Sequence, residues 1–237
     1  MLLFYVRHGD PIYSPDSLTP LGERQAEAVA KRLALYGIDE IYSSTSNRAM
    51  LTAKPLSEIV KKTPVLLDFA NEGHAWTQLT VHVDGARRWL FHSGEHRRLV
   101  NSEEFIKLGH RWYDHPEFAG GTFEEGMNRI LTESNAFLAS LGYEHIERTG
   151  AYKVTEDNNK RIAFFAHQGF GLAFLSAVLD IPYPQFCTHF DMTHTGVTVI
   201  EFKNENGFAY PKILTLSSDS HLYREGLPTK YNGAIYF

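Results

Sequence analysis

Short apolar runs alternate with amphipathic segments along most of this 237-residue chain. The runs have the length and composition of buried strands, and the segments between them space their apolar residues as helices do. Because strands joined by helices pair in parallel, this order predicts an α/β fold with three layers, a mainly parallel central sheet and helices on both faces. The expected strands are residues 2–6, 38–43, 64–67, 162–166, 197–202 and 212–216, and the expected helices are residues 20–36, 47–59, 123–141 and about 170–179.

Three of the expected helices begin at residues that commonly cap helices. Thr19 precedes Pro20, which places a hydroxyl at the N-cap and a proline at the first helical position. Ser46 is the expected N-cap of the second helix, and Thr122 to Glu125 has the pattern of a capping box. These residues indicate where the chain turns from loop to helix.

The composition limits the class of protein. Hydrophobic residues make up 43% and charged residues 22%, which is ordinary for a globular domain. The net charge of −5 argues against general affinity for nucleic acid, and no apolar run reaches the roughly 18 residues of a membrane span. Residues 2–6 have no basic region before them, so they are interpreted as a strand and not as a signal peptide. The single cysteine, Cys187, excludes an intrachain disulfide and fits a reducing compartment, so we expect a cytoplasmic location.

Residues 1–237 are interpreted as one domain with an insertion. The segment at about 73–121 holds all three tryptophans, Trp76, Trp89 and Trp112, and shows no clear alternation of strands and helices. We expect it to lie over the pocket as a lid and to contribute aromatic contacts to the substrate. Its basic residues indicate either a surface that attracts an anionic substrate or a solvated helix face. The sequence leaves the oligomeric state open.

Two histidines directly follow expected strands. His8 comes after the first strand and after Arg7, and His167 comes after the strand at 162–166. In open α/β sheets, ligands bind beyond the carboxyl ends of the strands, so both imidazoles are expected at one rim. Arg48, in the first turn of the second helix, and Glu72, just after the third strand, are expected at the same rim.

These residue types together suit a phosphoryl group, which carries negative charge over three oxygens. Arg7 and Arg48 offer fork-shaped donors with permanent charge, and the helix after His167 offers free N–H groups. A neutral imidazole at His8 is a nucleophile for phosphorus, and the nearby arginines are expected to lower its pKa. Glu72 is the candidate acid that protonates the leaving alkoxide.

A metal hydrolase is an alternative, because the chain has 12 histidines. His92 and His96 stand at the i, i+4 spacing of a metal pair on a helix. However, Gly94 lies between them and weakens that helix, and no third ligand follows at a typical spacing. We therefore expect no metal and no other cofactor.

Several segments, in order along the chain, carry the motifs of a known family. Arg7 to Asp10 reads RHGD, Leu18 to Ala26 reads LTPLGERQA, and Ser43 to Ala53 reads SSTSNRAMLTA. In these motifs the chain resembles the histidine phosphatase superfamily, which includes the phosphoglycerate mutases. The resemblance extends over most of the chain, through the further segments 121–124, 162–169 and 193–198.

The resemblance implies a phosphoglycerate mutase-like fold and a reaction without metal. It implies that His8 becomes the phosphohistidine and that Arg7, Arg48 and His167 hold the phosphoryl oxygens. Gln168 stands where the family often has glycine, and we include it among the predicted phosphate- or substrate-binding residues.

The resemblance also implies that Glu72 is first the general acid and then the base for the hydrolytic water. Three other acids are close in sequence to the motifs, and they are alternatives for this role: Asp10, Glu23 and Asp68. Glu72 is preferred because it lies between the third strand and the insertion, where a rim loop is expected.

We therefore expect a phosphatase that hydrolyses a phosphomonoester through a phosphohistidine. The expected substrate is a small phosphorylated molecule, with a phosphoprotein as an alternative. Two other functions remain open: phosphoryl transfer of the phosphoglycerate mutase type, and a non-catalytic module that binds a phosphorylated ligand. Residues 10–15 depart from the mutase pattern, which favours hydrolysis. The presence of His8 and a candidate acid favours an enzyme over a binding module.

Overall fold

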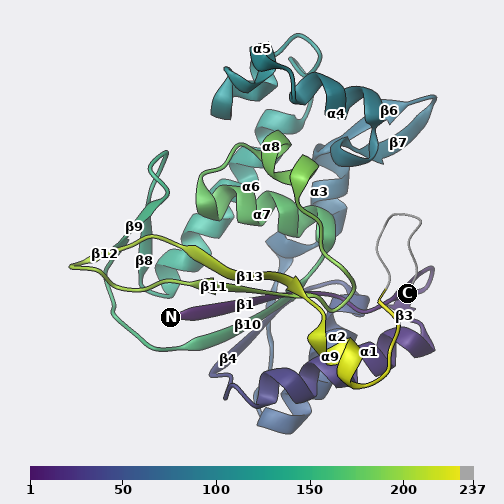
Figure 1. Cartoon of the computed structure of the whole chain (residues 1–237), viewed down its shortest axis with the longest axis vertical. Coiled ribbons are helices and arrows are strands. Elements are labelled where there is room, and N and C mark those ends of the chain that lie inside the picture. The colour runs from purple at the N-terminus through teal and green to yellow at the C-terminus, as the bar shows by residue number, and fades with distance from the viewer. Residues whose placement is uncertain (230–237) are drawn as a thin grey trace.

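A six-stranded mixed sheet runs through the middle of the molecule (Figure 1), whose residues 1–229 are described by the computed structural model. Residues 230–237 of the predicted 1–237 domain lie outside this described part. The strand order is β13-β11-β1-β10-β4-β5. The pairs β1–β10, β10–β4 and β4–β5 are parallel, whereas β11 is antiparallel to both of its neighbours, β1 and β13. The bounds are β1 (Leu2–Arg7), β4 (Glu40–Ser44), β5 (Val65–Leu67), β10 (Arg161–Ala166), β11 (Val197–Glu201) and β13 (Lys212–Ser218).

Helices cover both faces of this sheet (Figure 1). One face carries α1 (Pro20–Ala34), α2 (Asn47–Val60) and α9 (Ser220–Arg224), and the other carries α6 (Phe123–Ser140), α7 (Gln168–Leu179) and α8 (Tyr183–His189). The predicted three-layer α/β fold is confirmed, with the qualification that strand β11, which runs against the other strands of this sheet, makes the sheet mixed.

Strand β1 shows why the layers form. Its side chains alternate between the two faces, and from Leu3 onward they are nearly inaccessible to solvent. Phe4 and Val6 pack in the core with α1 and α2, whereas Leu3 and Tyr5 pack in the larger core with α6 and α7. A strand that is apolar on both faces needs a helix layer on each side, and the burial of this apolar surface is the main favourable term in folding.

The N-caps of the helices agree only in part with those predicted from the sequence. Thr19 accepts a hydrogen bond from the Gly22 N–H and Pro20 opens α1, as predicted. Ser46 precedes α2 but its hydroxyl makes no capping bond there; it lies 3.1 Å from a His167 ring nitrogen. The capping box at Thr122 is wrong, because the Thr122 hydroxyl donates to the carbonyl of Gln78. In both cases the hydroxyl bonds to a residue that is distant in sequence instead of to the backbone at the start of the helix.

The segment at 73–121 contains short helices and a hairpin that sequence periodicity did not reveal. Five of its aromatic residues pack in the same core as α6 and α7: Trp89, Phe91, Phe105, Trp112 and Phe118. Trp112 is buried and does not line the pocket that contains Arg48. The bounds are α3 (Glu72–Gln78), β6 (Thr80–Val83), β7 (Ala86–Trp89), η2 (Leu90–His92), α4 (Gly94–Val100), α5 (Glu103–Ile106) and η3 (Gly109–Asp114). The role of this segment as a lid stays a prediction.

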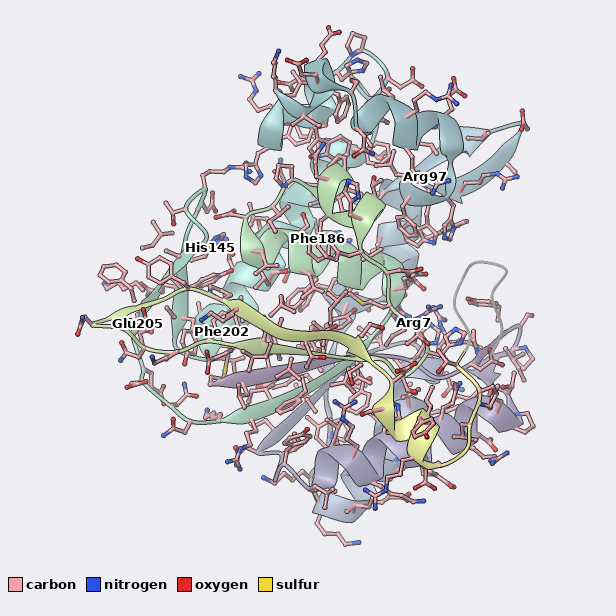
Figure 2. All side chains as sticks on the ribbon, in the orientation of Figure 1. Arg7, Arg97, His145, Phe186, Phe202 and Glu205 are labelled. Atoms are coloured by element: carbon pink, nitrogen blue, oxygen red, sulfur yellow. The ribbon has the colours of Figure 1, made fainter. Side chains whose placement is uncertain are left out.

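The basic residues of this segment lie at the surface. Arg87 and Arg88 on β7, and Arg97 and Arg98 on α4, are all exposed. Figure 2 shows Arg97 on α4, apart from Arg7 at the strand ends. Both interpretations of this basic surface, attraction of an anion and simple solvation, stay open.

Smaller strands complete the fold. A hairpin follows β1 and pairs β2 (Pro11–Tyr13) with β3 (Asp16–Leu18), and a separate three-stranded sheet joins β12 (Phe208–Ala209), β9 (Ala151–Val154) and β8 (Tyr143–Ile146). The 3-10 helix η1 (Asp68–Ala70) connects β5 to α3. Across residues 1–229, none of the helices combines the length and the apolar content needed to cross a bilayer.

The loop after β1 touches the start of α1 so closely that only glycine fits. A Cβ at Gly22 would lie 2.2 Å from the backbone oxygen of Asp10, and a Cβ at Gly9 would lie 2.6 Å from the Gly22 oxygen. We expect Gly22→Ala to lower the free energy of unfolding by about 2–3 kcal/mol, because backbone must move to relieve the overlap. Urea unfolding at equilibrium measures this change.

Gly94→Ala is the matched control for this prediction. A Cβ at Gly94 meets nothing within 4 Å, at the start of α4. We expect it to change stability by less than about 1 kcal/mol, in the stabilising direction. Equal losses in the two variants would show that the close approach of the Asp10 backbone to Gly22 does not matter for folding.

Candidate active site

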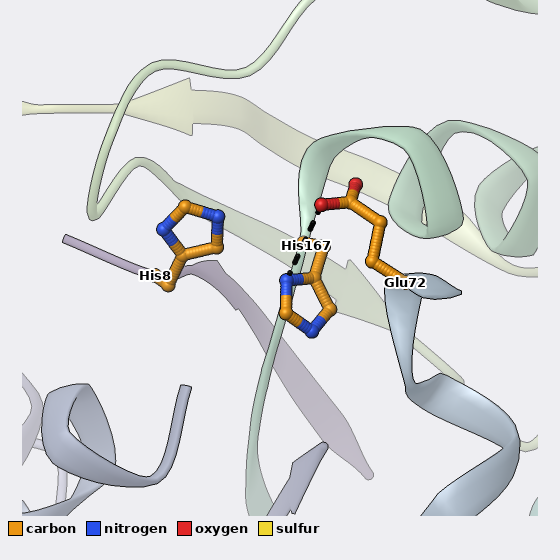
Figure 3. Close-up of side chains that lie close together, drawn as sticks. All are labelled: His8, Glu72 and His167. Atoms are coloured by element: carbon orange, nitrogen blue, oxygen red, sulfur yellow. Dashed lines mark ion pairs between the residues drawn. The ribbon is translucent and has the colours of Figure 1, made fainter. Parts of the chain in front are cut away.

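The two strand-end histidines lie side by side. Strands β1 and β10 are parallel neighbours, with Arg7 opposite Ala166, so the residues that follow them, His8 and His167, come out at the same rim. Their ring centroids are 5.2 Å apart (Figure 3). The Tyr5 hydroxyl fixes the backbone of His167, since it donates to the His167 carbonyl at 2.6 Å and accepts from its N–H at 3.2 Å.

His8 has a defined tautomer. Its Nδ1 lies 2.7 Å from the carbonyl oxygen of Gly9, and a carbonyl oxygen can only accept a hydrogen bond. Nδ1 therefore carries the proton, and in the neutral ring Nε2 has a free electron pair. The residue is 1% exposed, so nearly all of the ring is withdrawn from bulk water.

Arg48 connects the parts of the site. Its NH2 group lies 3.0 Å from Nδ1 of His167 and 3.1 Å from Oε2 of Glu72, and its NH1 group donates to Asp16 at 2.9 Å. Because the guanidinium only donates, Nδ1 of His167 accepts, and its Nε2–H donates to the Ser44 hydroxyl at 2.8 Å. The network thus sets the orientation of both Arg48 and His167.

Glu72 is the acid that the structure brings into this network. It is the first residue of α3, its Oε1 accepts from the N–H of Gly169 at 2.8 Å, and its Oε2 lies 3.5 Å from Nδ1 of His167 (Figure 3). The first turn of α7, which we expected to attract a phosphate, thus binds a carboxylate of the protein itself.

The alternative acids have other partners. Asp10 accepts from the Thr19 hydroxyl, and Glu23 is exposed on α1. Asp68, in η1, contacts Thr45 and has a side chain that is 74% exposed. Of the four acids considered from the sequence, Glu72 is the one whose carboxylate contacts Arg48 and His167.

Arg7 is held from the other side of the site. Its NH1 group donates to the Met192 carbonyl at 2.5 Å, and its NH2 group lies 3.0 Å from Nε2 of His194. The ring of His194 is 5.8 Å from that of His8 and its Nδ1 lies 3.4 Å from Asp10. Sequence reasoning noticed the segment around His194 but assigned it no role; its position just before a strand beside β1 was the available signal.

The side chain of Gln168, a predicted substrate-binding residue, has a partner outside the cluster formed by Arg48, Glu72 and His167. Gln168 follows His167 and is 6% exposed, and its side-chain amide donates to Asp191, in the loop before β11. Its part in binding substrate stays a prediction. Two further residues that sequence reasoning missed, Tyr13 and Asp16, come from the β2–β3 hairpin, and both contact Arg48.

Burial keeps both site histidines neutral. It lowers the pKa of His8 well below the usual 6.5, and repulsion from any proton on His167 and from the charges of Arg7 and Arg48 lowers it further. Burial, with Arg48 and Arg7, does the same to the pKa of His167. The sequence predicted this direction for His8 from the arginines, whereas burial is the larger cause.

These shifts predict a loss of stability in mild acid. Below pH 6.5 the unfolded chain protonates His8 and His167 but the folded protein does not, so the free energy of unfolding falls as the pH drops through this value. Above it the two histidines contribute no pH dependence. Urea unfolding at about pH 7.5 and about pH 5 measures the effect, and the loss should be smaller in His8→Ala. An equal loss in both proteins would contradict the assignment to His8.

The site contains groups that could ligate a metal. In the part of the chain that the structure describes, the one such cluster is His8, Glu72 and His167, with candidate ligand atoms within 4.8 Å of one another. Arg48 already donates to Glu72 and His167, and its permanent charge, with that of Arg7, disfavours a dication at this point. With Arg48 and Arg7 beside these side chains, the site therefore suits an anion better than a metal ion.

The alternative metal pair does not lie on one helix. His92 belongs to η2 and His96 to α4, and the chain changes direction between them at Ser93. Nδ1 of His96 lies 2.7 Å from the Ser93 hydroxyl. The alternative of a metal-binding pair on one continuous helix, which the sequence did not favour, is therefore contradicted.

A pocket of about 770 Å³ opens beside the catalytic candidates. Arg48 and Glu72 line it, and so do Trp76 and Trp89 from the segment at 73–121. A molecule whose charged end reached Arg48 would therefore place its remainder against these tryptophans.

The match to a family model decides the family. The model of the histidine phosphatase superfamily (branch 1) matches residues 3–129, more than half of the chain. This chain belongs to the histidine phosphatase superfamily. Arg7, His8, Arg48 and Glu72 of the site lie within the matched region, and His167 is brought to them by strand β10.

Curated relatives match part of this superfamily member. A probable phosphoglycerate mutase (GpmB) of Yersinia enterocolitica is 31% identical over 126 residues, which are 46% of this chain and 58% of the relative. A putative phosphoserine phosphatase 2 of Hydrogenobacter thermophilus is 32% identical over 124 residues, 44% of this chain and 61% of the relative. The chain thus aligns with about three-fifths of the length of these relatives.

Solved structures of superfamily members share the fold. A phosphoserine phosphatase variant of Entamoeba histolytica, in complex with phosphoserine, has a TM-score of 0.58 at 19% identity and covers 93% of this chain and 98% of that one. A mycobacterial glucosyl-3-phosphoglycerate phosphatase in complex with VO3 has a TM-score of 0.59 at 18% identity, with coverages of 92% and 99%. At these identities the likeness concerns the fold.

Proposed function

We propose that this protein is a metal-independent phosphatase that hydrolyses a small phosphomonoester through a phosphohistidine at His8. The observation that carries the proposal is the state of His8: its Nδ1–H is held by Gly9, its Nε2 electron pair is free, and its pKa lies well below the usual value. Such a ring is a ready nucleophile at neutral pH. The names of the relatives, a phosphoserine phosphatase and a phosphoglycerate mutase, support the same chemistry.

In the first half of the reaction, Nε2 of His8 attacks phosphorus and the bond from phosphorus to the ester oxygen breaks. Arg7 and Arg48 donate to the phosphoryl oxygens, where negative charge is greatest in the transition state, and His167 does so when a phosphoryl oxygen replaces Ser44 as the acceptor of its N–H. Glu72, in its protonated form, gives its proton to the departing alkoxide. The products of this half are the free alcohol, a phosphohistidine and an ionised Glu72.

In the second half, water attacks the phosphohistidine. The Glu72 carboxylate takes a proton from this water while the new bond from oxygen to phosphorus forms and the bond to Nε2 breaks. Inorganic phosphate leaves, His8 regains its electron pair, and Glu72 again carries a proton. One carboxyl thus serves both halves, as acid and then as base.

Substrate binding changes the partners of Glu72. In the structure its two oxygens accept from Arg48 and from the Gly169 N–H. A phosphoryl group beside them competes for the same two donors. The donors that bind the Glu72 carboxylate in the free protein are therefore also available to an arriving phosphoryl group.

Phosphoryl transfer of the mutase type shares the first half of this reaction and differs in the acceptor, which is an alcohol instead of water. Release of inorganic phosphate in equal amount to the free alcohol separates the two reactions. Transfer of the phosphoryl group to an added acceptor alcohol would favour the mutase reaction.

Trapping of the intermediate tests the proposal. Brief incubation with a 32P-labelled phosphomonoester, followed by denaturation, should leave label on the protein that is lost in acid and stable in base, as expected for phosphate on a histidine nitrogen. A chelator should leave the labelling unchanged. Turnover without any trapped label, or turnover that a chelator abolishes, would contradict the proposal.

A further inference from the structure

Aromatic rings surround the residues that would act on the ester bond. Trp76 and Trp89 meet edge to face with ring centroids 5.1 Å apart, and the Tyr13 ring lies 5.5 Å from the Arg48 guanidinium. All three residues line the pocket of about 770 Å³. The leaving alcohol of any ester that reaches Arg48 and Glu72 has to lie among these rings.

Trp89 is rigidly placed against the site. A Cβ on Gly169 would lie 2.3 Å from the Trp89 ring, so the ring rests directly on Gly169, whose N–H binds Glu72. Trp89 is 9% exposed and stacks on Phe91, whereas Trp76 is 38% exposed and turns its free surface to the pocket. Trp89 thus gives the pocket a fixed ring next to Glu72, and Trp76 gives it an accessible ring beside Trp89.

The charges of the same pocket disfavour a second anionic group. Within residues 1–229, its lining has one cation, Arg48, and two carboxylates, Asp16 and Glu72. Arg48 donates to both carboxylates, and Asp16 also accepts from the Asn47 N–H at 2.8 Å. Among these described lining residues, a carboxylate on the leaving alcohol finds no cation beyond the one needed for the phosphoryl group, and it faces the fixed charge of Asp16.

We propose that this pocket selects phosphomonoesters whose alcohol carries an uncharged ring, and that it disfavours alcohols with a carboxylate or a second phosphate. The inference rests on the proposed function, since it assigns the leaving-group side of that reaction. Ring faces packed against Trp76 and Trp89 stabilise the bound ester, and the carboxylates of the lining penalise added negative charge.

Three esters of primary alcohols test the two parts of the inference: ethyl phosphate, 2-phenylethyl phosphate and 2-(4-carboxyphenyl)ethyl phosphate. Their leaving alcohols have similar basicity, so proton donation by Glu72 contributes about equally and the ranking reports the pocket. We expect kcat/KM for the phenyl ester to exceed that for the ethyl ester by about 30-fold. The added carboxylate should lower kcat/KM again by about 10-fold.

Variants of Trp76 locate the effect. Trp76→Ala should remove most of the preference for phenyl over ethyl ester, and Trp76→Phe should keep most of it because a ring is retained. Trp76 lies on α3 with 38% exposure, so thermal unfolding should show both variants folded. Tyr223→Ala, on α9 with 90% exposure, is the control that should leave the preference unchanged.

Binding to His8→Ala gives a readout that does not need turnover. Dissociation constants of the three esters, from tryptophan fluorescence or calorimetry, should follow the same order. If the carboxylated ester equals or exceeds the phenyl ester, or Trp76→Ala keeps the ring preference, the inference is overturned. If this order holds in binding while wild type hydrolyses none of the esters, the proposed function fails and the assignment of the pocket stands.

Discussion

The His8→Ala protein should lose hydrolysis of phosphomonoesters by about 10⁴-fold or more in kcat, with its fold intact. The reason is that Nε2 of His8 forms the bond to phosphorus, and the alanine side chain offers no nucleophile in its place. His167 is next to it, but Nδ1 of His167 accepts from Arg48 and Nε2–H donates to Ser44, so neither nitrogen is available.

His82→Ala is the matched control, because His82 is exposed on β6, away from the pocket lining and the strand ends. It should leave kcat within about twofold, as is usual for surface changes. Steady-state kinetics and the trapped phosphoprotein are measured on both variants. Retained turnover or labelling in His8→Ala would show that another group is the nucleophile.

The Glu72→Gln protein should show an effect that depends on the leaving group. For an alkyl phosphate, kcat/KM should fall by roughly 10²–10³-fold, because the alkoxide leaves only with a proton. For p-nitrophenyl phosphate the fall should be less than about 10-fold, because nitrophenolate leaves without one. The introduced side-chain amide keeps a carbonyl oxygen that can accept from the Gly169 N–H, so the change mainly removes the proton.

Asp68→Asn provides the comparison, since Asp68 is a nearby acid with a 74% exposed side chain. We expect it to slow neither ester. Equal slowing of both esters in Glu72→Gln would remove Glu72 from the role of acid and would leave it as a partner of Arg48 only.

The sequence predicted the sheet and both site histidines because those features follow from local pattern. An apolar run that stops at Arg7 shows where β1 ends, and a second such run places His167. The carboxyl ends of parallel strands lie at the same edge of a sheet, so the rings of His8 and His167 were expected at that edge. Arg48 was found for a similar reason, since the residue lies in the first turn of a helix that follows the neighbouring strand β4.

The predicted cap hydrogen bonds of Ser46 and Thr122 failed because each hydroxyl had a second, competing partner. The hydroxyls of Ser46 and Thr122 suit helix caps, but each is used in a contact with a residue far away in sequence. The first turn of α7 suits phosphate, yet in the structure it binds the carboxylate of Glu72. The local sequence pattern shows which hydrogen bonds such a group can make. The packing of the fold determines which of these bonds forms.

What the sequence determined by itself is the periodicity of burial, and with it the layers, the strand ends and the identities of Arg7, His8, Arg48 and His167. Only the tertiary structure decided that Glu72, among four acids, reaches Arg48, and that Tyr13, Asp16 and His194 surround the site. The physical reason is range: strand and helix patterns act over a few residues, whereas these contacts join segments whose separation along the chain carries no periodic signal.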